Sequence, residues 1–404
     1  MSGLALVCAR LGATVTGSDR AESSYMERLR AAGLEPTVGH DAANLPEGAE
    51  VVVSTAIAAD NPELALAREH GIEPIHRGAL LAELCAEKRL IAIAGTHGKT
   101  TTAAMTAWAL RGIGADPAFF VGGEVPGLGE DAAANAGWGE GEWVVAEADE
   151  SDASFLELRP EIAVVTNVEM DHHTRWGSLG ELRTAFGEFL GSAGAGALPA
   201  DGSLDGLGPA GTPIHFDTDR PGPAELSLSV PGAHNRANAR AALAAVELAG
   251  LDVDAAAAAL RDFPGVRRRL ELKGERGGFR IYDDYAHHPT EVRAALTALR
   301  ELGPERLLAV FQPHLYSRTK ALAEEFGAAL ALADEVVVLD VYPAREEPVG
   351  ELAGVSGRDV AVAAADRAGG RPVWWLPQAE RAASALGPRL AEGEILVTIG
   401  AGDI

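Results

Sequence analysis

Lysine is scarce in this chain of 404 residues, which has only Lys88, Lys99, Lys273 and Lys320. Cysteine is scarcer still, because Cys8 and Cys85 cannot build a disulfide framework and neither has metal-ligand spacing. This usage is typical of a reducing cytoplasm. No apolar run approaches the length that spans a bilayer, and the start MSGLALVCARLGATVTG lacks a basic leader before an apolar segment. We therefore expect a cytoplasmic protein.

Basic residues are outnumbered by acidic residues over the whole chain. The chain has 34 Lys and Arg against 59 Asp and Glu, a net charge of −25. Such a field repels nucleic acid and anionic membranes, so we expect neither as a partner, and solubility alone could explain the acidity. An anionic small substrate would need positive charge gathered at its site. A hydrophobic share of 47% and a charged share of 23% are those of a globular protein, and the length suits two to four domains.

The pattern of the chain alternates strand-like and helix-like segments, which predicts βαβ units around parallel sheets. Strands are expected at residues 13–19, 49–57, 73–77, 89–95, 143–149, 161–167, 279–285, 307–313, 335–343 and 394–403. Helices are expected at residues 25–34, 63–72, 101–114, 235–249 and 321–330, with another starting at Pro289. Residues 191–233 are rich in Gly, Ala and Pro, which predicts a loop-rich region. FPGVRRRLE reads as a joint between domains. The fold class is therefore α/β.

The segment GTHGKT, residues 95–100, joins a predicted strand to a predicted helix. Glycines let a backbone turn tightly and aim several N–H groups into one concavity, and a helix N-terminus adds about half a positive charge. A lysine there can reach β- and γ-phosphates, and the next hydroxyl can bind Mg²⁺. The general phosphate-loop pattern has a further glycine where this chain has Ile93. GTHGKT indicates a nucleotide site, although an ordinary strand-to-helix turn would look similar.

Acidic and polar groups follow the next two predicted strands. VVAEADESDASF places Glu147, Asp149, Glu150 and Asp152 at a strand end, which suits Mg²⁺ beside a phosphate loop but is also typical of a solvated acidic loop. VVTNVEMDHH repeats the arrangement with Asn167, Glu169, Asp171, His172 and His173. Two histidines beside carboxylates favour a metal or phosphate role over a structural one.

The last third carries further polar clusters. In PGAHNRANA, Asn235 and Asn238 share a helix face, where they could cap the helix or contact a base edge. YDDYAHHPTE and FQPHLYSRT follow two predicted strands, which suggests a rim facing a ligand. VRRRLE is the densest basic run, and it suits either phosphate binding or salt bridges at a domain joint.

These motifs, in this order over nearly the whole chain, resemble the Mur ligases, the ATP-dependent amide-forming enzymes of peptidoglycan synthesis. GTHGKTTT, EADESDASFL, TNVEMDH, HNRAN, DDYAHHPTE, FQPHLYSRT, DVYPAREEP and GAGD carry the resemblance. EADESDASF and DDYAHHPTE resemble the branch that adds L-alanine to UDP-N-acetylmuramate. The resemblance implies a Rossmann-like UDP-binding domain at 1–86, a central P-loop ATPase domain at 87–263, shortened at 191–233, and a C-terminal Rossmann-like α/β ligase domain at 264–404.

The resemblance also implies roles for particular residues. ATP would lie on Gly95, Thr96, His97, Gly98, Lys99, Thr100, Thr101, Asn238, Arg269 and Asp284. Mg²⁺ would be held by Thr100, Glu147 and His172, and the catalytic residues would be Lys99, Glu147, His172 and Arg318. Substrates would contact Asp19, Asn167, Tyr285, His287 and Arg318. Several relatives support a metal with a carbamylated lysine, which this chain cannot do because no lysine lies between Lys99 and Lys273.

Some features depart from the family pattern. The family begins with a strand and a glycine loop ending in GMSG, whereas this chain begins at MSG, and it stops where the family adds a last helix. We therefore expect a chain truncated at both ends. Leu315 stands where many members have arginine. Two alternatives stay open: a recycling ligase that adds a preformed peptide, against which EADESDASF argues, and a non-catalytic nucleotide-binding remnant, against which Lys99, Glu147, His172 and Asp284 argue.

Overall fold

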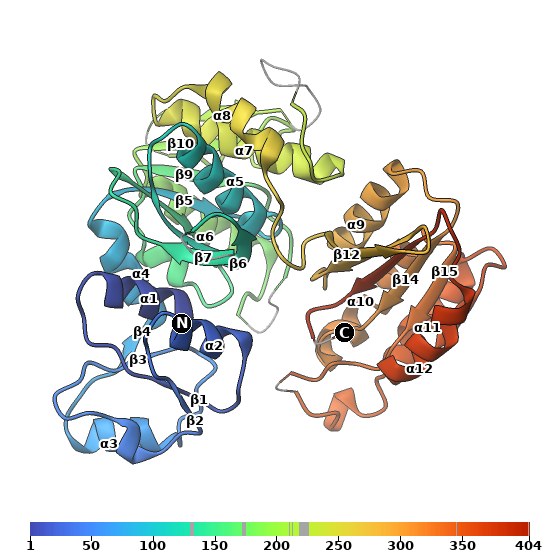
Figure 1. The fold of residues 1–404 in the computed structure, drawn as a ribbon, viewed down its shortest axis with the longest axis horizontal. Coiled ribbons are helices and arrows are strands. Elements are labelled where there is room, and N and C mark those ends of the chain that lie inside the picture. Colours follow the sequence, from blue (N-terminus) through green and yellow to red (C-terminus); the bar gives the residue numbers. More distant parts are fainter. Residues whose placement is uncertain are drawn as a thin grey trace. The chain divides into compact units, whose positions relative to one another are not determined.

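The structure is a computed structural model that describes residues 1–129, 133–171, 175–209, 211, 213–217, 226–344, 346–402 and 404. The chain forms two compact units (Figure 1). The first comprises Met1–Ser227 and Ala237–Phe263, and the second comprises Leu228–Arg236 and Pro264–Ile404. The last boundary falls within FPGVRRRLE. The division of residues 1–86 from 87–263 stays a prediction. In the described part of the chain, no helix has the length and apolarity to cross a membrane.

The N-terminal part of the first unit contains two separate two-stranded parallel sheets, β1-β2 and β3-β4. Its elements are α1 (Ser2–Arg10), β1 (Ser18–Asp19), α2 (Ser24–Ala31), β2 (Thr37–Val38), η1 (Ala42–Asn44), β3 (Val52–Val53), α3 (Pro62–Glu69), β4 (Ile75–His76) and α4 (Arg77–Ala86). The strands predicted at 13–19, 49–57 and 73–77 are present but much shorter. Each has a single hydrogen-bonded neighbour, and a two-stranded ladder is marginal without further strands.

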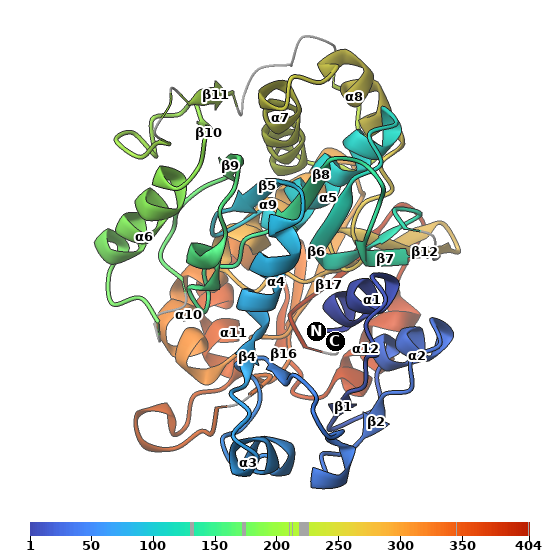
Figure 2. The same ribbon diagram turned by 90° about the vertical axis from the view of Figure 1, so that its left-hand side faces the viewer.

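The rest of the first unit is built on a seven-stranded sheet of order β11-β10-β9-β5-β8-β6-β7, parallel except between β6 and β7. Figure 2 shows this order running across the sheet. The strands are β5 (Arg89–Ala94), β6 (Ala118–Pro126), β7 (Ala133–Gly137), β8 (Trp143–Glu147), β9 (Ile162–Val165), β10 (Ala195–Pro199) and β11 (Ile214–Phe216). The helices are α5 (Lys99–Gly112), η2 (Ser154–Glu157), α6 (Leu179–Gly191), α7 (Ala233–Leu248), α8 (Val253–Ala259) and η3 (Leu260–Asp262). Of α7, the residues from Ala237 onward belong to this unit. The loop-rich prediction for 191–233 is wrong at β10 and β11, because β10 reads AGALP and has no β-branched residue to announce it.

The second unit contains a six-stranded sheet of order β12-β13-β17-β14-β15-β16, parallel except between β12 and β13. The strands are β12 (Glu271–Arg276), β13 (Phe279–Asp284), β14 (Leu307–Phe311), β15 (Glu335–Val338), β16 (Val373–Trp375) and β17 (Ile395–Ile399). The helices are α9 (Pro289–Glu301), α10 (Tyr316–Leu330), η4 (Gly350–Leu352), α11 (Gly357–Arg367), α12 (Ala379–Leu386) and η5 (Gly387–Arg389). The predicted α/β class is confirmed in both units.

Buried apolar strands give each sheet its core. β5 is buried from Leu90 to Ala94, and β14 and β15 are buried along their whole length. Strands covered on both faces read as continuous apolar runs rather than alternating ones, which is why the sequence pattern found them. In the central sheet β5 lies between β9 and β8, so the segments that follow these three strands emerge at the same edge. That edge receives the predicted phosphate loop and both acidic clusters.

Candidate active site

The phosphate loop, residues 95–98, connects β5 to α5 through two glycines in left-handed backbone conformations. Gly95 has φ of 132° and Gly98 has φ of 82°, a region that other residues rarely adopt. A Cβ at Gly95 would lie 2.1 Å from the Thr166 Oγ1, and one at Gly98 would lie 2.4 Å from the Asn238 Oδ1. Conformation and space therefore both require glycine at these positions, and they bring the loop close to two other segments of the site.

Lys99 is the first residue of α5 and its ammonium is enclosed by acceptors. Its Nζ donates to the carbonyl oxygens of Gly95 at 2.6 Å and Thr96 at 3.1 Å, and lies 2.8 Å from the Glu150 Oε2. Burial acts to lower the pKa of Lys99, but the nearby carboxylates of Glu150, Asp149 and Glu147 outweigh it, and the pKa is raised. The side chain therefore stays charged, which is what an anionic ligand requires of it.

Thr100 and Glu147 form an oxygen-rich pair beside this lysine. The Thr100 Oγ1 donates to the Glu147 Oε1 at 3.0 Å, and the Gly122 N–H donates to the Glu147 Oε2 at 2.6 Å. β6 supplies Gly122 from a register shift in its pairing with β7, between Phe120 and Val125. A hydroxyl and a carboxylate are the hard oxygen donors that Mg²⁺ prefers, so the pair fits this ion. His172, the third predicted ligand, lies outside the described residues.

The acidic loop after β8 joins the phosphate loop to the start of α4. The Arg77 Nη2 donates to the Asp149 Oδ2 at 3.1 Å and to the Asp152 Oδ2 at 2.9 Å. Burial acts to raise the pKa of Asp149, but Lys99, the Ser151 N–H and Arg77 prevail and the pKa is lowered. Glu150, which is 1% exposed, is the deepest of these acids. Sequence reasoning noted the acids but missed Arg77 and Gly122, for which no local pattern offered a signal.

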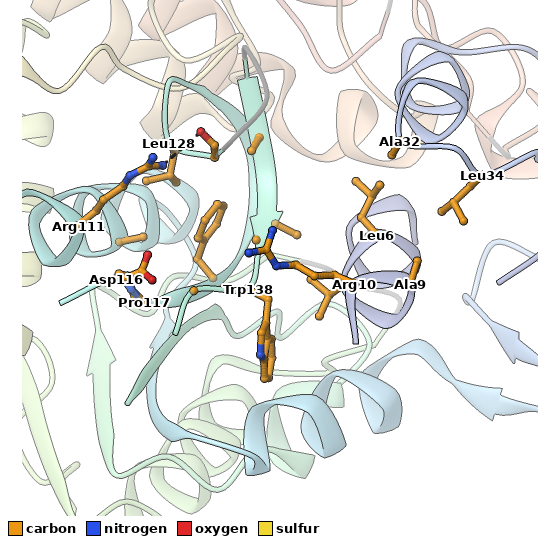
Figure 3. A pocket seen from close by; sticks show the side chains of 18 residues that line it. Leu6, Ala9, Arg10, Ala32, Leu34, Arg111, Asp116, Pro117, Leu128 and Trp138 are labelled. Carbon is orange, nitrogen blue, oxygen red and sulfur yellow. Dashed lines mark hydrogen bonds between the residues drawn. The ribbon is translucent and has the colours of Figure 1, made fainter. Parts of the chain in front are cut away.

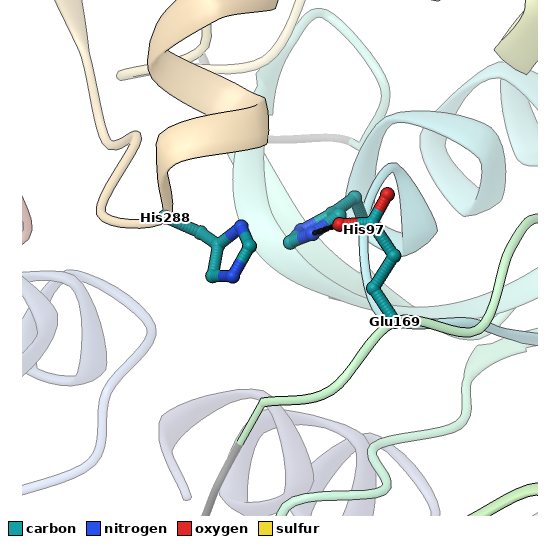
Figure 4. Close-up of side chains that lie close together, drawn as sticks. All are labelled: His97, Glu169 and His288. Carbon is teal, nitrogen blue, oxygen red and sulfur yellow. Dashed lines mark hydrogen bonds and ion pairs between the residues drawn. The ribbon is translucent and has the colours of Figure 1, made fainter. Parts of the chain in front are cut away.

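The loop after β9 lies against the phosphate loop. Asn167 contacts the backbone of His97, and the Glu169 carboxylate lies 3.3 Å from the His97 Nε2 (Figure 4). At the Gly98 end of the phosphate loop, α7 brings Asn238, whose Oδ1 accepts from the Thr102 Oγ1 at 3.3 Å. The structure thus brings together predicted residues of the first unit from β5, α5, β8, β9 and α7.

Asp19, predicted to contact substrate, lies exposed at the end of β1, where its backbone carbonyl accepts from the Gly39 N–H. Thr101 is buried in the first turn of α5. A cavity of about 510 Å³ lies elsewhere in the first unit, lined by α1, α5, β6 and β7 and by Arg10, Arg111 and Trp138 (Figure 3). The residues that line it do not include the phosphate loop.

In the second unit, Asp284 ends β13 and is held by backbone donors. Its Oδ2 accepts from the Leu270 N–H at 2.7 Å and its Oδ1 from the Ala286 N–H at 2.8 Å. Burial raises the pKa of Asp284 to about 6, although Arg269 and these two N–H groups act to lower it. The carboxyl therefore changes its charge around pH 6.

The other predicted residues of the second unit surround Tyr285. The guanidinium groups of Arg268 and Arg269 lie 5.1 and 5.2 Å from its ring centroid, and His287 packs edge-on against it at 5.4 Å. The sheet order β13-β17-β14 places the segment after β14 at the same edge. There the Arg318 Nη1 lies 3.2 Å from the His314 Nδ1, and His314 lies 6.0 Å from His287. A basic and aromatic rim of this kind suits an anionic ligand.

Three families of Mur ligase domains match the chain. The description "Mur ligase family, catalytic domain" covers residues 1–89, "Mur ligase middle domain" covers 93–198, and "Mur ligase, glutamate ligase domain" covers 268–402. The matches leave few residues outside them apart from 199–267, and they follow one another in chain order.

Individual relatives agree with these matches. A UDP-N-acetylmuramate–L-alanine ligase of Renibacterium salmoninarum is 44% identical, over all of this chain and 91% of the relative. The crystal structure of the UDP-N-acetylmuramate–alanine ligase MurC of Thermotoga maritima has a TM-score of 0.83 and 28% identity, covering all of this chain and 93% of the other. The MurF ligase of Thermotoga maritima in complex with ADP shares the fold, with a TM-score of 0.62, 17% identity, and coverage of 88% and 92%.

Proposed function

Because the chain belongs to the Mur ligase family, we propose that it joins L-alanine to UDP-N-acetylmuramate while converting ATP to ADP and phosphate. This is the ligase reaction that the motifs predicted, and the relatives just described favour it over the peptide-recycling alternative. The observation that carries the proposal is the assembly of Lys99, Thr100 and Glu147 at one edge of the central sheet. A chain that had lost its chemistry would have no physical reason to keep a charged, buried lysine among three carboxylates.

The reaction has two steps. The lactyl carboxylate oxygen of the sugar nucleotide attacks the γ-phosphorus of ATP, the bond to the β-phosphate oxygen breaks, and ADP leaves. The amine of L-alanine then attacks the acyl carbon, and the carbon–oxygen bond to phosphate breaks as the amide forms and the amine loses its proton to solvent. Activation is needed because a carboxylate is a poor electrophile.

The residues of the first unit can support the phosphoryl step. Lys99 carries a fixed positive charge at the N-terminus of α5, which favours the charge that develops on the transferred phosphoryl group. Thr100 and Glu147 would hold Mg²⁺, and the ion would supply Lewis-acid stabilisation of the phosphates. Gly122 keeps one Glu147 oxygen oriented while the other faces Thr100.

The residues of the second unit can support the other contacts. Asp284 offers a carboxyl for a ribose hydroxyl, while Arg269 offers charge for phosphate oxygens. Arg318, 7% exposed and beside His314, offers a cation for the alanine carboxylate, with Tyr285 and His287 in the same rim. Asn238 lies against the phosphate loop through Gly98, which suits its predicted place near the nucleotide.

The test is phosphate release by the purified chain with ATP, Mg²⁺ and UDP-N-acetylmuramate, with and without L-alanine. We expect release that depends on both substrates and falls to background in Lys99→Ala. Lys320→Ala is the matched control, because Lys320 is an exposed lysine on α10 paired with Glu351, and it should behave as the unmodified chain. Release that is independent of L-alanine, or that survives in Lys99→Ala, would refute the proposal. Glycine and serine in place of L-alanine would measure selectivity.

A further inference from the structure

The segment after β9 continues the pairing of β9 with β5 beyond the ends of both strands. β9 and β5 are parallel, with Val165 opposite Ala94. Past that point the Thr166 N–H donates to the Ala94 carbonyl at 3.0 Å, and the Thr96 N–H donates to the Asn167 carbonyl at 3.0 Å. The phosphate loop therefore does not leave the sheet freely, because its first residues remain hydrogen-bonded to residues 166–169, which we call the clasp.

Asn167 is the centre of the clasp. Its Oδ1 accepts from the His97 N–H at 2.9 Å and its Nδ2 donates to the His97 carbonyl at 2.9 Å. The Nδ2 also donates to the Thr166 Oγ1 at 3.3 Å. One carboxamide thus satisfies both backbone groups of one loop residue, as a neighbouring strand would. Exchanging the amide oxygen and nitrogen would set donor against donor, so the contacts also fix the orientation of the side chain.

Two further side chains reinforce the same attachment. The Thr96 Oγ1 donates to the Glu169 carbonyl at 3.0 Å and accepts from the Glu169 N–H at 2.9 Å. The Thr166 Oγ1 donates to the His97 carbonyl at 2.6 Å. A threonine hydroxyl both donates and accepts, so it can make such reciprocal bonds, whereas valine has the same shape without the hydroxyl. The clasp therefore holds Thr96 and His97 by backbone and side chain alike.

We infer that Asn167 is a positioning residue that fixes the backbone of the phosphate loop before the nucleotide binds. The inference rests on the proposed function for the identity of the ligand and differs from the substrate contact that the resemblance implies for Asn167. Its amide is engaged with the loop, so its effect on ligation passes through His97 and the neighbouring Lys99. A loop that is already ordered loses less conformational freedom on binding, and its affinity for nucleotide is higher for that reason.

The first experiment compares two ligands in one variant. The equilibrium dissociation constants of a fluorescent ADP analogue and of UDP-N-acetylmuramate are measured for the unmodified chain, Asn167→Ala and Asn167→Asp. We expect ADP binding to weaken about tenfold in Asn167→Ala, the effect of losing hydrogen bonds to enclosed backbone groups, and further in Asn167→Asp, whose second oxygen would face the His97 carbonyl. Binding of UDP-N-acetylmuramate should change less than twofold. Asn44→Ala is the matched control, because Asn44 also holds a loop carbonyl, that of Gly39 at 3.1 Å, outside the phosphate loop.

Two outcomes would overturn the inference. Weaker UDP-N-acetylmuramate binding with unchanged ADP binding would make Asn167 a direct substrate contact, and unchanged binding of both would deny it any role. Thr96 gives a second pair of variants: Thr96→Ser keeps the hydroxyl that bonds to Glu169, so it should bind ADP several-fold more tightly than Thr96→Val, which lacks it. Equal ADP affinity in these two variants would also contradict the clasp.

A measurement on the unmodified chain covers the case in which the variants fail to fold. Hydrogen exchange of the His97 amide, which is donated to Asn167, should be slow before any nucleotide is added. Rapid exchange there would overturn the inference. Neither measurement needs turnover, so a chain that binds ADP and shows a slow His97 amide but forms no amide product would refute the proposed function and leave the clasp standing.

Discussion

The two units place polar side chains in the same part of their sheets, at the carboxyl ends of parallel strands, but with different arrangements of charge. In the first unit Lys99 lies among Glu147, Asp149 and Glu150, and Arg77 contacts Asp149 from the start of α4. In the second unit the buried carboxyl of Asp284 lies near Arg269, and Arg268 and Arg269 flank Tyr285. These two arginines also pair with Asp283 and Glu291. The first arrangement gathers negative oxygen and suits a divalent cation beside phosphate. The second places two arginines against an aromatic ring, beside several acids, and the basic and aromatic groups suit an anionic substrate.

The difference also shows in how each region fixes its central residue. Lys99 donates to two backbone carbonyls, and the carboxylates around it outweigh the effect of burial and raise its pKa. Asp284 is held by two backbone N–H groups, and there burial prevails over the nearby arginine. Removing a charge in the first region should therefore change ligand binding and catalysis. Removing one in the second region should change how the stability of the chain depends on pH.

Glu147→Gln should have the largest effect. It keeps the shape of the side chain and the acceptor facing Gly122, but it removes the negative charge that would hold Mg²⁺ with Thr100. We expect phosphate release to fall about 10²–10³-fold, the size typical of losing one electrostatic contact in an active site. The measurement is the rate as a function of Mg²⁺ concentration. Glu157→Gln, on the exposed face of η2, is the control, and a Glu147→Gln rate within threefold of the control would contradict this reading.

Asp284 should make the free energy of unfolding depend on pH. Its pKa in the folded chain is raised to about 6 by burial, against about 3.9 for an unfolded aspartate. The folded chain therefore binds this proton more tightly, and the free energy of unfolding falls as the pH rises from about 4 through 6. The full cost, present above pH 6, is at most about 3 kcal/mol, of which about 1 kcal/mol develops between pH 5 and 7.

Carbon-13 NMR of the aspartate carboxyls checks this directly. One resonance should titrate with a midpoint near 6 and be missing in Asp284→Asn. Urea unfolding at pH 5 and 7 should show the unmodified chain losing stability relative to that variant as the pH rises. A midpoint below about 4.5, within the usual range of aspartate, would show that backbone donors and Arg269 prevail over burial. The contrast between the two regions would then be lost.

Glu150→Gln should have a smaller effect, on stability. Glu150 is the partner of Lys99 at 2.8 Å and is 1% exposed, so the variant leaves a buried ammonium with fewer compensating charges. Breaking a buried pair costs about 3–5 kcal/mol. Asp149 and Glu147 still face the lysine here, so we expect roughly 1–3 kcal/mol. Urea unfolding at pH 7 measures it, again with Glu157→Gln as control. Equal midpoints in the two variants would mean that Glu150 is dispensable to Lys99.

The sequence was a good guide where a strand is buried on both faces. β5, β8 and β9 read as continuous apolar runs, so the polar groups after them were placed at strand ends correctly. Their partners were not predictable, because they depend on the spatial order β9-β5-β8-β6, which brings Gly122 to Glu147 and Asn167 to His97. Arg77 reaches Asp149 from 72 residues away in the sequence, and no local pattern records such a contact.

The sequence predictions were weakest where neighbouring strands determine whether a strand forms and how long it is. The strands expected at 13–19, 49–57 and 73–77 shrink to two residues each, since each pairs with one neighbour only. Conversely, β10 forms from AGALP because β9 and β11 lie on both sides of it, although its sequence favours a loop. Propensity is a weak guide in both cases, because the number of neighbouring strands determines whether a ladder extends.

The smallest predicted effect concerns backbone strain that both regions share. Ala153, in the loop after β8, has φ of 63°, and Leu315, in the loop after β14, has φ of 69°. A left-handed backbone conformation costs a non-glycine residue about 1 kcal/mol. Glycine avoids this cost, but it loses more conformational freedom on folding, which offsets part of the gain. Ala153→Gly should therefore stabilise the chain by up to about 0.5–1 kcal/mol, measured by urea unfolding. Leu315→Gly should gain less, because it also removes a large side chain, and a larger gain there would show that strain, and not packing, dominates the second region.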